Sequence, residues 1–178
     1  MDTPIYPRVL IQTELGDILL ELYIHQAPVT VHNFLRYVEE NRFAGATFYR
    51  VVLMDNQPNN KIKIEVIQGG LKEDNHPLSL SPIAHESTQQ TGILHKDGVI
   101  SMARDEPGTA SSDFFICVGD QPELDFGGMR NPDGAGFAAF GKVIEGMDVV
   151  SKIHNSPVRD QTLEPNIAIL KIELKTGR

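Results

Sequence analysis

The sequence of 178 residues lacks tryptophan entirely and contains a single cysteine, Cys117. One cysteine cannot form an internal disulfide or build a cysteine-rich zinc or iron–sulfur site, and its apolar neighbours predict a buried thiol. Basic residues are fewer than acidic ones: the chain has 16 Lys and Arg and 24 Asp and Glu, which gives a net charge of −8. An acidic chain is poorly suited to nucleic acid and to anionic membranes, so we expect neither partner. No hydrophobic run approaches the ~20 residues that a membrane-spanning helix needs.

Several catalytic motifs are missing as well. No Gly-x-Ser-x-Gly nucleophile elbow occurs, and neither Gly69-Gly70 nor Gly127-Gly128 is followed by the Lys-Ser/Thr of a phosphate-binding loop. His85 and His95 lie ten residues apart in a loop-like region, whereas the zincin motif places two histidines on one helix face. We expect both to be loop histidines that bond to the backbone. The sequence therefore predicts no metal site and no cofactor.

The length and the ordinary composition favour a single domain over residues 1–178. Apolar residues make up 40% of the chain and charged residues 22%, which is typical of a globular protein with one core. The N-terminal residues show no basic flank followed by an apolar block. A signal peptide is therefore not expected at this end, and the cytoplasm is the expected location.

Hydrophobic periodicity predicts a β-rich fold with two helices. A helix is expected from Pro28, because Val31, Phe34, Leu35 and Val38 form one apolar stripe. The expected strands cover residues 9–13, 18–23, 47–52, 62–68, 99–103, 114–118, 137–144 and 166–174, and a second short helix covers 147–154. This pattern indicates a closed barrel or a sandwich, since closure removes exposed strand edges and a helix can cover each open end.

Arg50 is the most informative charged residue, because it interrupts the apolar run 47–52. Taken alone, such an arginine is typical of a solvated charge on a barrel face. Gln68 ends the next expected strand, and pairing of the two strands would bring a guanidinium and a carboxamide to a common surface. Phe114-Phe115 and Phe137 would supply apolar walls beside them.

Six short segments carry a more specific signal. They are Ala27–Phe34, Phe48–Val52, Ile67–Gly70, Gly98–Arg104, Ser111–Ile116 and Phe140–Met147. In this order, and over about residues 8–174, they resemble the cyclophilins. The resemblance implies a mainly β fold, a closed eight-stranded antiparallel β-barrel capped by two α-helices. It also implies peptidyl-prolyl cis/trans isomerase activity, which assists folding by accelerating rotation about X–Pro bonds without a metal or cofactor.

The resemblance assigns roles to eight residues. The catalytic arginine of the family falls on Arg50 and the catalytic glutamine on Gln68. The substrate-binding positions fall on Val66, Ala103, Arg104, Phe115, Leu124 and Phe137. The expected partners are proline-containing polypeptides, and the protein is expected to act as a monomer.

The sequence departs from the family pattern at several positions. The pocket-wall position that is usually aromatic is Glu65, which would alter the depth of the proline pocket. Phe137 replaces a histidine, so that the wall stays aromatic and loses a polar tip. Glu123 stands where a tryptophan helps bind cyclosporin, so weak cyclosporin binding is expected. The loop between Val51 and Ile67 is also longer than usual.

Two functions of different classes fit these residues. The first is a prolyl isomerase. The alternative is a barrel that binds proline-containing peptides with little or no turnover, which Glu65 favours. A small-molecule enzyme on a similar barrel is a third reading, but it lacks a convergent acid/base pair. Peptide binding without rate enhancement would distinguish the second function from the first.

Overall fold

The computed structural model describes residues 5–176, and these residues form nine strands, three α-helices and one 3₁₀ turn. The strands are β1 (Arg8–Thr13), β2 (Gly16–Leu22), β3 (Thr47–Val52), β4 (Val66–Gly70), β5 (Val99–Met102), β6 (Phe114–Cys117), β7 (Ala138–Glu145), β8 (Val158–Arg159) and β9 (Thr162–Thr176). The helices are α1 (Pro28–Glu39), α2 (Thr88–Thr91) and α3 (Met147–His154), and the 3₁₀ turn covers Pro122–Leu124.

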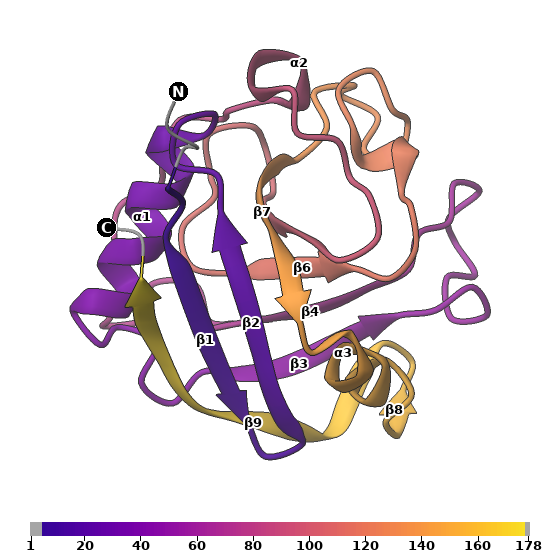
Figure 1. The fold of residues 1–178 in the computed structure, drawn as a ribbon. Coiled ribbons are helices and arrows are strands. Elements are labelled where there is room, and N and C mark those ends of the chain that lie inside the picture. The colour runs from indigo at the N-terminus through magenta and orange to yellow at the C-terminus, as the bar shows by residue number, and fades with distance from the viewer. Residues whose placement is uncertain (1–4, 177–178) are drawn as a thin grey trace.

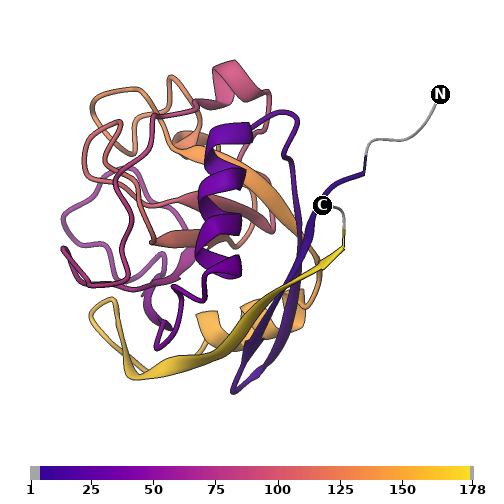
Figure 2. The same cartoon turned by 90° about the vertical axis from the view of Figure 1, so that its left-hand side faces the viewer.

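Eight of the strands close into one antiparallel barrel. Their order is β1-β2-β7-β5-β6-β4-β3-β9, and the ring closes because β9 also pairs with β1, while the two-residue β8 pairs with β9 alone. The expected eight-stranded barrel is therefore confirmed. α1 packs on β7 and β9, and α3 packs on β2, β3 and β4, so the two longer helices cover different parts of the barrel (Figures 1 and 2). α2 is a single turn that the periodicity did not predict.

α1 forms for the reasons that its sequence suggests. Pro28 occupies its first turn, and Val31, Phe34, Leu35 and Val38 are buried on one face. No side chain of the preceding residue caps the helix. No described helix of the protein combines the length and the apolar character that crossing a membrane requires.

The buried apolar residues form two clusters, one on each side of the barrel wall. The large cluster fills the interior, and Phe48, Ile67 and Ile116 belong to it. The small cluster includes Val66 and Phe115, which alternate with the interior residues along β4 and β6. Because neighbouring strand residues point to opposite faces, the same strands build both the core and an apolar patch on the outer wall.

The strand that we expected over residues 62–68 is wrong in its first half, because β4 begins only at Val66. Instead, the side chain of Gln57 forms hydrogen bonds with the backbone of Ile64. Its Oε1 accepts from the Ile64 N–H at 3.1 Å, and its Nε2 donates to the Ile64 carbonyl at 2.8 Å. A side chain thus takes the place of a strand partner, and the apolar alternation before Val66 does not produce a ladder.

The N-terminus of α1 depends on a residue far along the chain. Glu86, which is 3% exposed, accepts from Thr30 N at 2.7 Å, from Thr30 Oγ1 at 2.6 Å and from Val29 N at 3.3 Å. Its carboxylate satisfies N–H groups that the helix leaves unpaired, and it lies at the positive end of the helix dipole. One side chain therefore fastens the loop before β5 to the helix.

We predict that Glu86→Ala lowers the free energy of unfolding by about 2 kcal/mol, because it leaves buried donors without an acceptor. Urea unfolding followed by circular dichroism measures this loss. Glu73→Ala, which removes an exposed carboxylate from the same loop, is the control and should change stability by less than about 0.5 kcal/mol. Equal stability of the two variants would contradict the capping role.

Candidate active site

A row of side chains crosses four neighbouring strands on the outer wall. Arg50 of β3 is opposite Gln68 of β4, and Gln68 is opposite Phe115 of β6. Phe115 in turn is opposite Ser101 of β5. Adjacent strands are about 4.8 Å apart, so the row brings a guanidinium, a carboxamide and an aromatic ring into direct proximity.

A β-bulge in β3 places Arg50 in this row. The register of β3 shifts between Phe48 and Arg50 against both of its neighbouring strands. Phe48 and Val51 are fully buried in the interior cluster, so the two residues between them, Tyr49 and Arg50, both turn outward. Strict alternation would direct Arg50 into the core with Phe48. The bulge is thus the local feature that makes the arginine available to a ligand.

Two glutamines fix the direction of the Arg50 guanidinium. Its Nη1 donates to Gln68 Oε1 at 2.7 Å, and its Nε and Nη2 donate to Gln161 Oε1 at 3.0 and 2.8 Å. Gln161 is held in turn, because its Nε2 donates to the carbonyl of Asn56 at 3.0 Å. Three of the five guanidinium N–H groups are used in this way, and two keep no partner among residues 5–176. Burial lowers the pKa of Arg50, although arginine stays protonated at any working pH.

A second set of bonds fixes Gln68. Its Nε2 donates to the Tyr49 hydroxyl at 2.9 Å, and this hydroxyl donates to Asp113 Oδ2 at 2.9 Å. Burial, followed by the charge of Asp113, raises the pKa of Tyr49 far above its usual range. Tyr49 therefore stays a neutral donor, and it sets the orientation of the Gln68 amide with Oε1 toward Arg50.

An open cleft of about 360 Å³ lies over this row. All eight residues that the sequence assigned to the site line it. They are Arg50, Val66, Gln68, Ala103, Arg104, Phe115, Leu124 and Phe137. The structure thus brings together residues that span much of the chain, while their individual roles stay predictions. The floor of the cleft is the small apolar cluster on the outer wall, with Ala103 and Phe137 packed against it.

Aromatic contacts hold Phe115 at the centre of the floor. The ring of Phe137 meets it edge-on, with centroids 5.6 Å apart, and the ring of His95 stacks on it at 6.0 Å. His95 lies between Asp125 Oδ1 and Ser101 Oγ, at 2.7 and 2.8 Å. Our expectation for this histidine is wrong, because its ring bonds to side chains and supports the pocket from behind.

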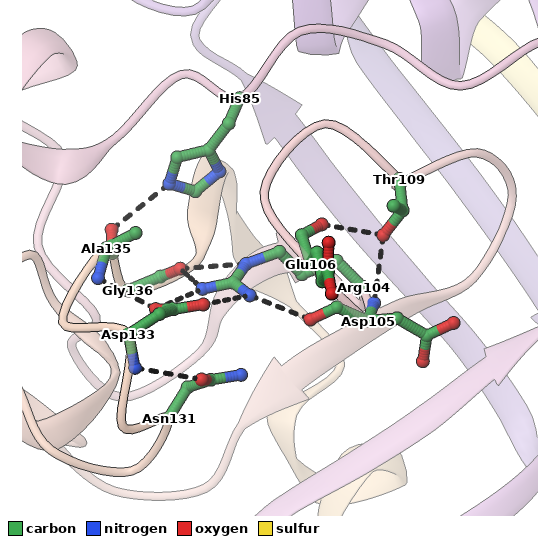
Figure 3. Close-up of polar contacts among 9 residues, drawn as sticks. All are labelled: His85, Arg104, Asp105, Glu106, Thr109, Asn131, Asp133, Ala135 and Gly136. Carbon is green, nitrogen blue, oxygen red and sulfur yellow. Dashed lines mark hydrogen bonds and ion pairs between the residues drawn. The ribbon is translucent and has the colours of Figure 1, made fainter.

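The expectation for His85 is confirmed, because its Nε2 lies 3.1 Å from the carbonyl oxygen of Ala135 (Figure 3). Residues 5–176 hold no group of three or more His, Cys, Asp or Glu side chains placed to bind a metal ion.

The thiol of Cys117 is buried as expected, and burial raises its pKa well above the usual range. It therefore stays protonated and apolar in the pocket floor.

Arg104 contributes to the cleft by holding one of its walls (Figure 3). Its side chain is 1% exposed, and its two terminal nitrogens donate to the Asp133 carboxylate at 2.9 and 3.1 Å. Its Nε donates to the carbonyl of Gly136 at 3.0 Å, and its Cζ lies 4.7 Å from the ring centroid of Phe137. The Arg104 bonds hold the pKa of Asp133 below its usual value. The pair fastens the loop after residue 125 beside the pocket and positions Phe137.

Glu65 does not form the pocket wall, contrary to our expectation. Its Oε2 lies 3.3 Å from Nε2 of His154 in α3, and the residue is absent from the cleft lining. Ile64, which is 6% exposed, fills the wall beside Val66 instead. Neighbouring residues of an extended segment point to opposite faces, so Ile64 and Val66 line the cleft while Glu65 between them points away from it.

Comparisons with known proteins agree with this geometry. The profile of the family described as cyclophilin type peptidyl-prolyl cis-trans isomerase/CLD matches residues 8–174. A peptidyl-prolyl cis-trans isomerase of Acinetobacter baylyi is 36% identical over 176 residues, which cover 94% of this chain and 85% of the relative. Peptidyl-prolyl cis-trans isomerase B of Escherichia coli is 35% identical, over 82% of each chain.

The chain belongs to the cyclophilin family of peptidyl-prolyl cis/trans isomerases. The activity expected from the sequence is the activity of this family. A crystal structure of a Cryptosporidium parvum cyclophilin in the presence of the dipeptide Ala-Pro has the same fold, with a TM-score of 0.73, 24% identity and coverage of 95% of this chain and 99% of that one.

Sequence reasoning missed three kinds of site residue. It missed Tyr49 and Asp113, although both stand inside the quoted segments, within two residues of a predicted site residue. It missed Gln161, which reaches Arg50 from a distant turn and shows no local pattern. It also missed Arg130, which lies in a glycine-rich loop and lines the cleft. None of these contacts follows from spacing along the chain.

We predict that Gln161→Ala lowers kcat about tenfold and leaves KM within about twofold, because a loosely held Arg50 is misaligned for the reaction rather than lost. Proline-isomer exchange of a tetrapeptide measures both constants. Arg159→Ala, at the end of the neighbouring strand β8 and paired with Glu164 outside the cleft, is the control and should leave kcat unchanged. A wild-type kcat in a folded Gln161→Ala variant would remove Gln161 from this positioning role.

Proposed function

We propose that this cyclophilin accelerates rotation about X–Pro bonds in proline-containing polypeptides through Arg50, with Gln68 beside it. The observation that carries the proposal is the 2.7 Å bond from Arg50 Nη1 to Gln68 Oε1 at the edge of an apolar pocket. A positively charged donor and a place for a proline ring are thus adjacent. No covalent bond is made or broken in this reaction, so the site needs neither a nucleophile nor an acid/base pair.

The chemistry explains why an arginine suffices. Rotation about the peptide bond faces a barrier of ~18–20 kcal/mol, because the C–N bond has partial double-bond character. In the twisted transition state the proline nitrogen becomes pyramidal and keeps its lone pair. A donor aimed at this lone pair stabilises the twisted form and not the planar ones, which lowers the barrier.

The contacts of Arg50 suit this task. Gln68 and Gln161 hold three of its N–H groups, and the other two remain to donate to a bound peptide. A donor that is already oriented needs no reorganisation during the reaction. Gln68 also keeps one amide N–H beyond the one given to Tyr49, and we assign it to a neighbouring peptide carbonyl.

The apolar side chains would hold the proline ring while the carbonyl side rotates. Val66, Phe115, Leu124 and Phe137 are the predicted ring contacts, and Ile64 joins them in the lining. Their surfaces exclude water, which strengthens the interaction of the guanidinium with the nitrogen. The backbone of Ala103 is the predicted contact for the peptide chain.

The alternative function, peptide binding without turnover, rested on Glu65. Because this carboxylate lies against His154, the pocket keeps an apolar wall, and the feature that favoured the alternative is gone. The oriented guanidinium supports turnover, since holding a proline ring requires no charged donor at the nitrogen.

We predict that Arg50→Ala lowers kcat/KM at least a hundredfold, since one oriented donor contributes about 3 kcal/mol to transition-state stabilisation. A proline-limited refolding reaction measures the rate, and thermal unfolding confirms that the variant is folded. Arg42→Ala, which lies outside the cleft and pairs with Glu40, is the control. A near-normal rate in folded Arg50→Ala would exclude the proposed role.

We propose that cyclosporin binds weakly, because Glu123 stands at the tryptophan position and its Oε2 accepts from Met129 N at 2.8 Å. We expect titration calorimetry to give no nanomolar binding for the wild type and tighter binding for Glu123→Trp. Nanomolar binding by the wild type would contradict this proposal.

We also propose that the protein acts as a monomer, in the cytoplasm, without nucleic-acid or membrane partners. The net charge of −8 supports the last point, since it disfavours phosphate backbones and anionic lipid. The oligomeric state and the location stay predictions from the sequence.

A further inference from the structure

The arginines of this protein differ in their charge partners. The structure describes seven of them, at positions 8, 36, 42, 50, 104, 130 and 159. Five have a carboxylate partner, at 2.7 to 3.7 Å. Within residues 5–176, the two that form no ion pair are Arg50 and Arg130, and both line the cleft. The chain has a net charge of −8, yet two guanidinium groups without a carboxylate partner lie at one site. This arrangement indicates a binding site for an anionic group.

Arg130 is bound only to neutral acceptors. Its Nη1 donates to Gln57 Oε1 and to the carbonyl of Ile62, both at 2.6 Å. Its Nε and Nη2 donors have no partner among the described residues. Partial burial, followed by the positive charge of Arg50, lowers the pKa of Arg130. Both cations line the same cleft, and neither has a carboxylate partner among the described residues.

The charges of the cleft are separated along β4. Arg130 holds Ile62 and Gln57 in the loop that leads into Val66, the first residue of β4. Arg50 is opposite Gln68, in the middle of the strand. The acidic residues of the lining are Asp74, Asp105 and Asp113.

These acidic residues lie near the other end of β4. Asp74 follows the last strand residue, Gly70, while Asp113 precedes Phe114, which is opposite Gly69. Asp105 follows β5, whose Met102 is opposite Phe114. The Asp113 carboxylate is already engaged by the Tyr49 hydroxyl. A peptide lying along the cleft would thus meet an unpaired cation on one side of its proline and exposed carboxylates on the other.

We propose that Arg130 is a specificity-determining residue that selects proline segments with a carboxylate on one side of the proline. This inference deepens the proposed function, because it assumes that the proline ring occupies the pocket beside Arg50. The carboxylate would belong either to an acidic side chain or to the free end of a peptide chain.

The physical basis is the unmet bonding capacity of Arg130. Its neutral partners use one terminal nitrogen, and the Nε–Nη2 edge can donate two parallel bonds to one carboxylate. Such charge-assisted bonds are about twice as strong as neutral ones. Elsewhere the acidic surface repels an anionic ligand, so a gain for acidic peptides must come from cations in the cleft.

The test compares kcat/KM for four peptides of one length, all acetylated at the N-terminus. The first three are amidated and carry alanine around the proline, glutamate directly after the proline, or glutamate two residues before it. The fourth is the alanine peptide with a free carboxylate one residue after the proline. We expect the wild type to prefer a carboxylate on one side only, by roughly five- to tenfold over the neutral peptide. The fourth peptide then distinguishes a chain end from an acidic side chain.

Variants test whether the preference for a carboxylate depends on Arg130. In Arg130→Gln the ratio of acidic to neutral kcat/KM should fall to within about twofold, while Arg130→Lys, which keeps the charge but not the fork, should retain part of it. Arg36→Gln on α1 makes the same change of charge outside the cleft and should retain all of it. Added salt should reduce the preference in the wild type.

Three results would overturn the proposal: no preference in the wild type, an equal gain with glutamate on either side, or a preference that persists in Arg130→Gln. The wild-type comparison stands even if Arg130→Gln fails to fold. Absence of turnover with all four peptides would instead contradict the proposed function. Titration calorimetry with the same peptides would then still measure whether Arg130 selects the carboxylate.

Discussion

The site depends on one extra residue in β3. Phe48 and Val51 must both point into the barrel core, and the bulge between them turns Tyr49 and Arg50 outward together. Tyr49 then orients Gln68, and Gln68 orients Arg50. The packing of the barrel interior thus sets the direction of a charged group on the outer wall, and a strand without the bulge would bury that charge among apolar side chains.

The remaining parts of the site come from loops that are fastened to this wall. Gln161 reaches Arg50 from the turn before β9, and Arg104 holds the loop that carries Phe137. Arg130 joins the loop before β4 to the loop before β7. Each connection is a guanidinium bound to an amide, carbonyl or carboxylate oxygen. A barrel of this kind supplies the rigid surface, and a few arginine contacts decide how its loops shape the pocket.

Much of this architecture was predictable from the sequence, and the exceptions have physical causes. Hydrophobic alternation and the six family-like segments were sufficient for the barrel and for eight of the residues that line the cleft. Alternation failed before Val66, because the Gln57 side chain replaces a strand partner. Glu65 was misplaced because it lies between Ile64 and Val66, which face the cleft, and its own carboxylate contacts His154. Gln161 and Arg130 could not be predicted, because contacts across 111 and 73 residues of chain leave no local pattern.

The central claim is that an oriented guanidinium, and not positive charge alone, lowers the rotation barrier. Exchange NMR on a proline peptide that saturates the protein measures cis/trans interconversion in the bound state, separately from affinity. We predict that Arg50→Lys, which keeps the charge but not the fork, binds the peptide within about threefold of the wild type and interconverts it at least about tenfold more slowly. Interconversion at the wild-type rate in folded Arg50→Lys would contradict the claim.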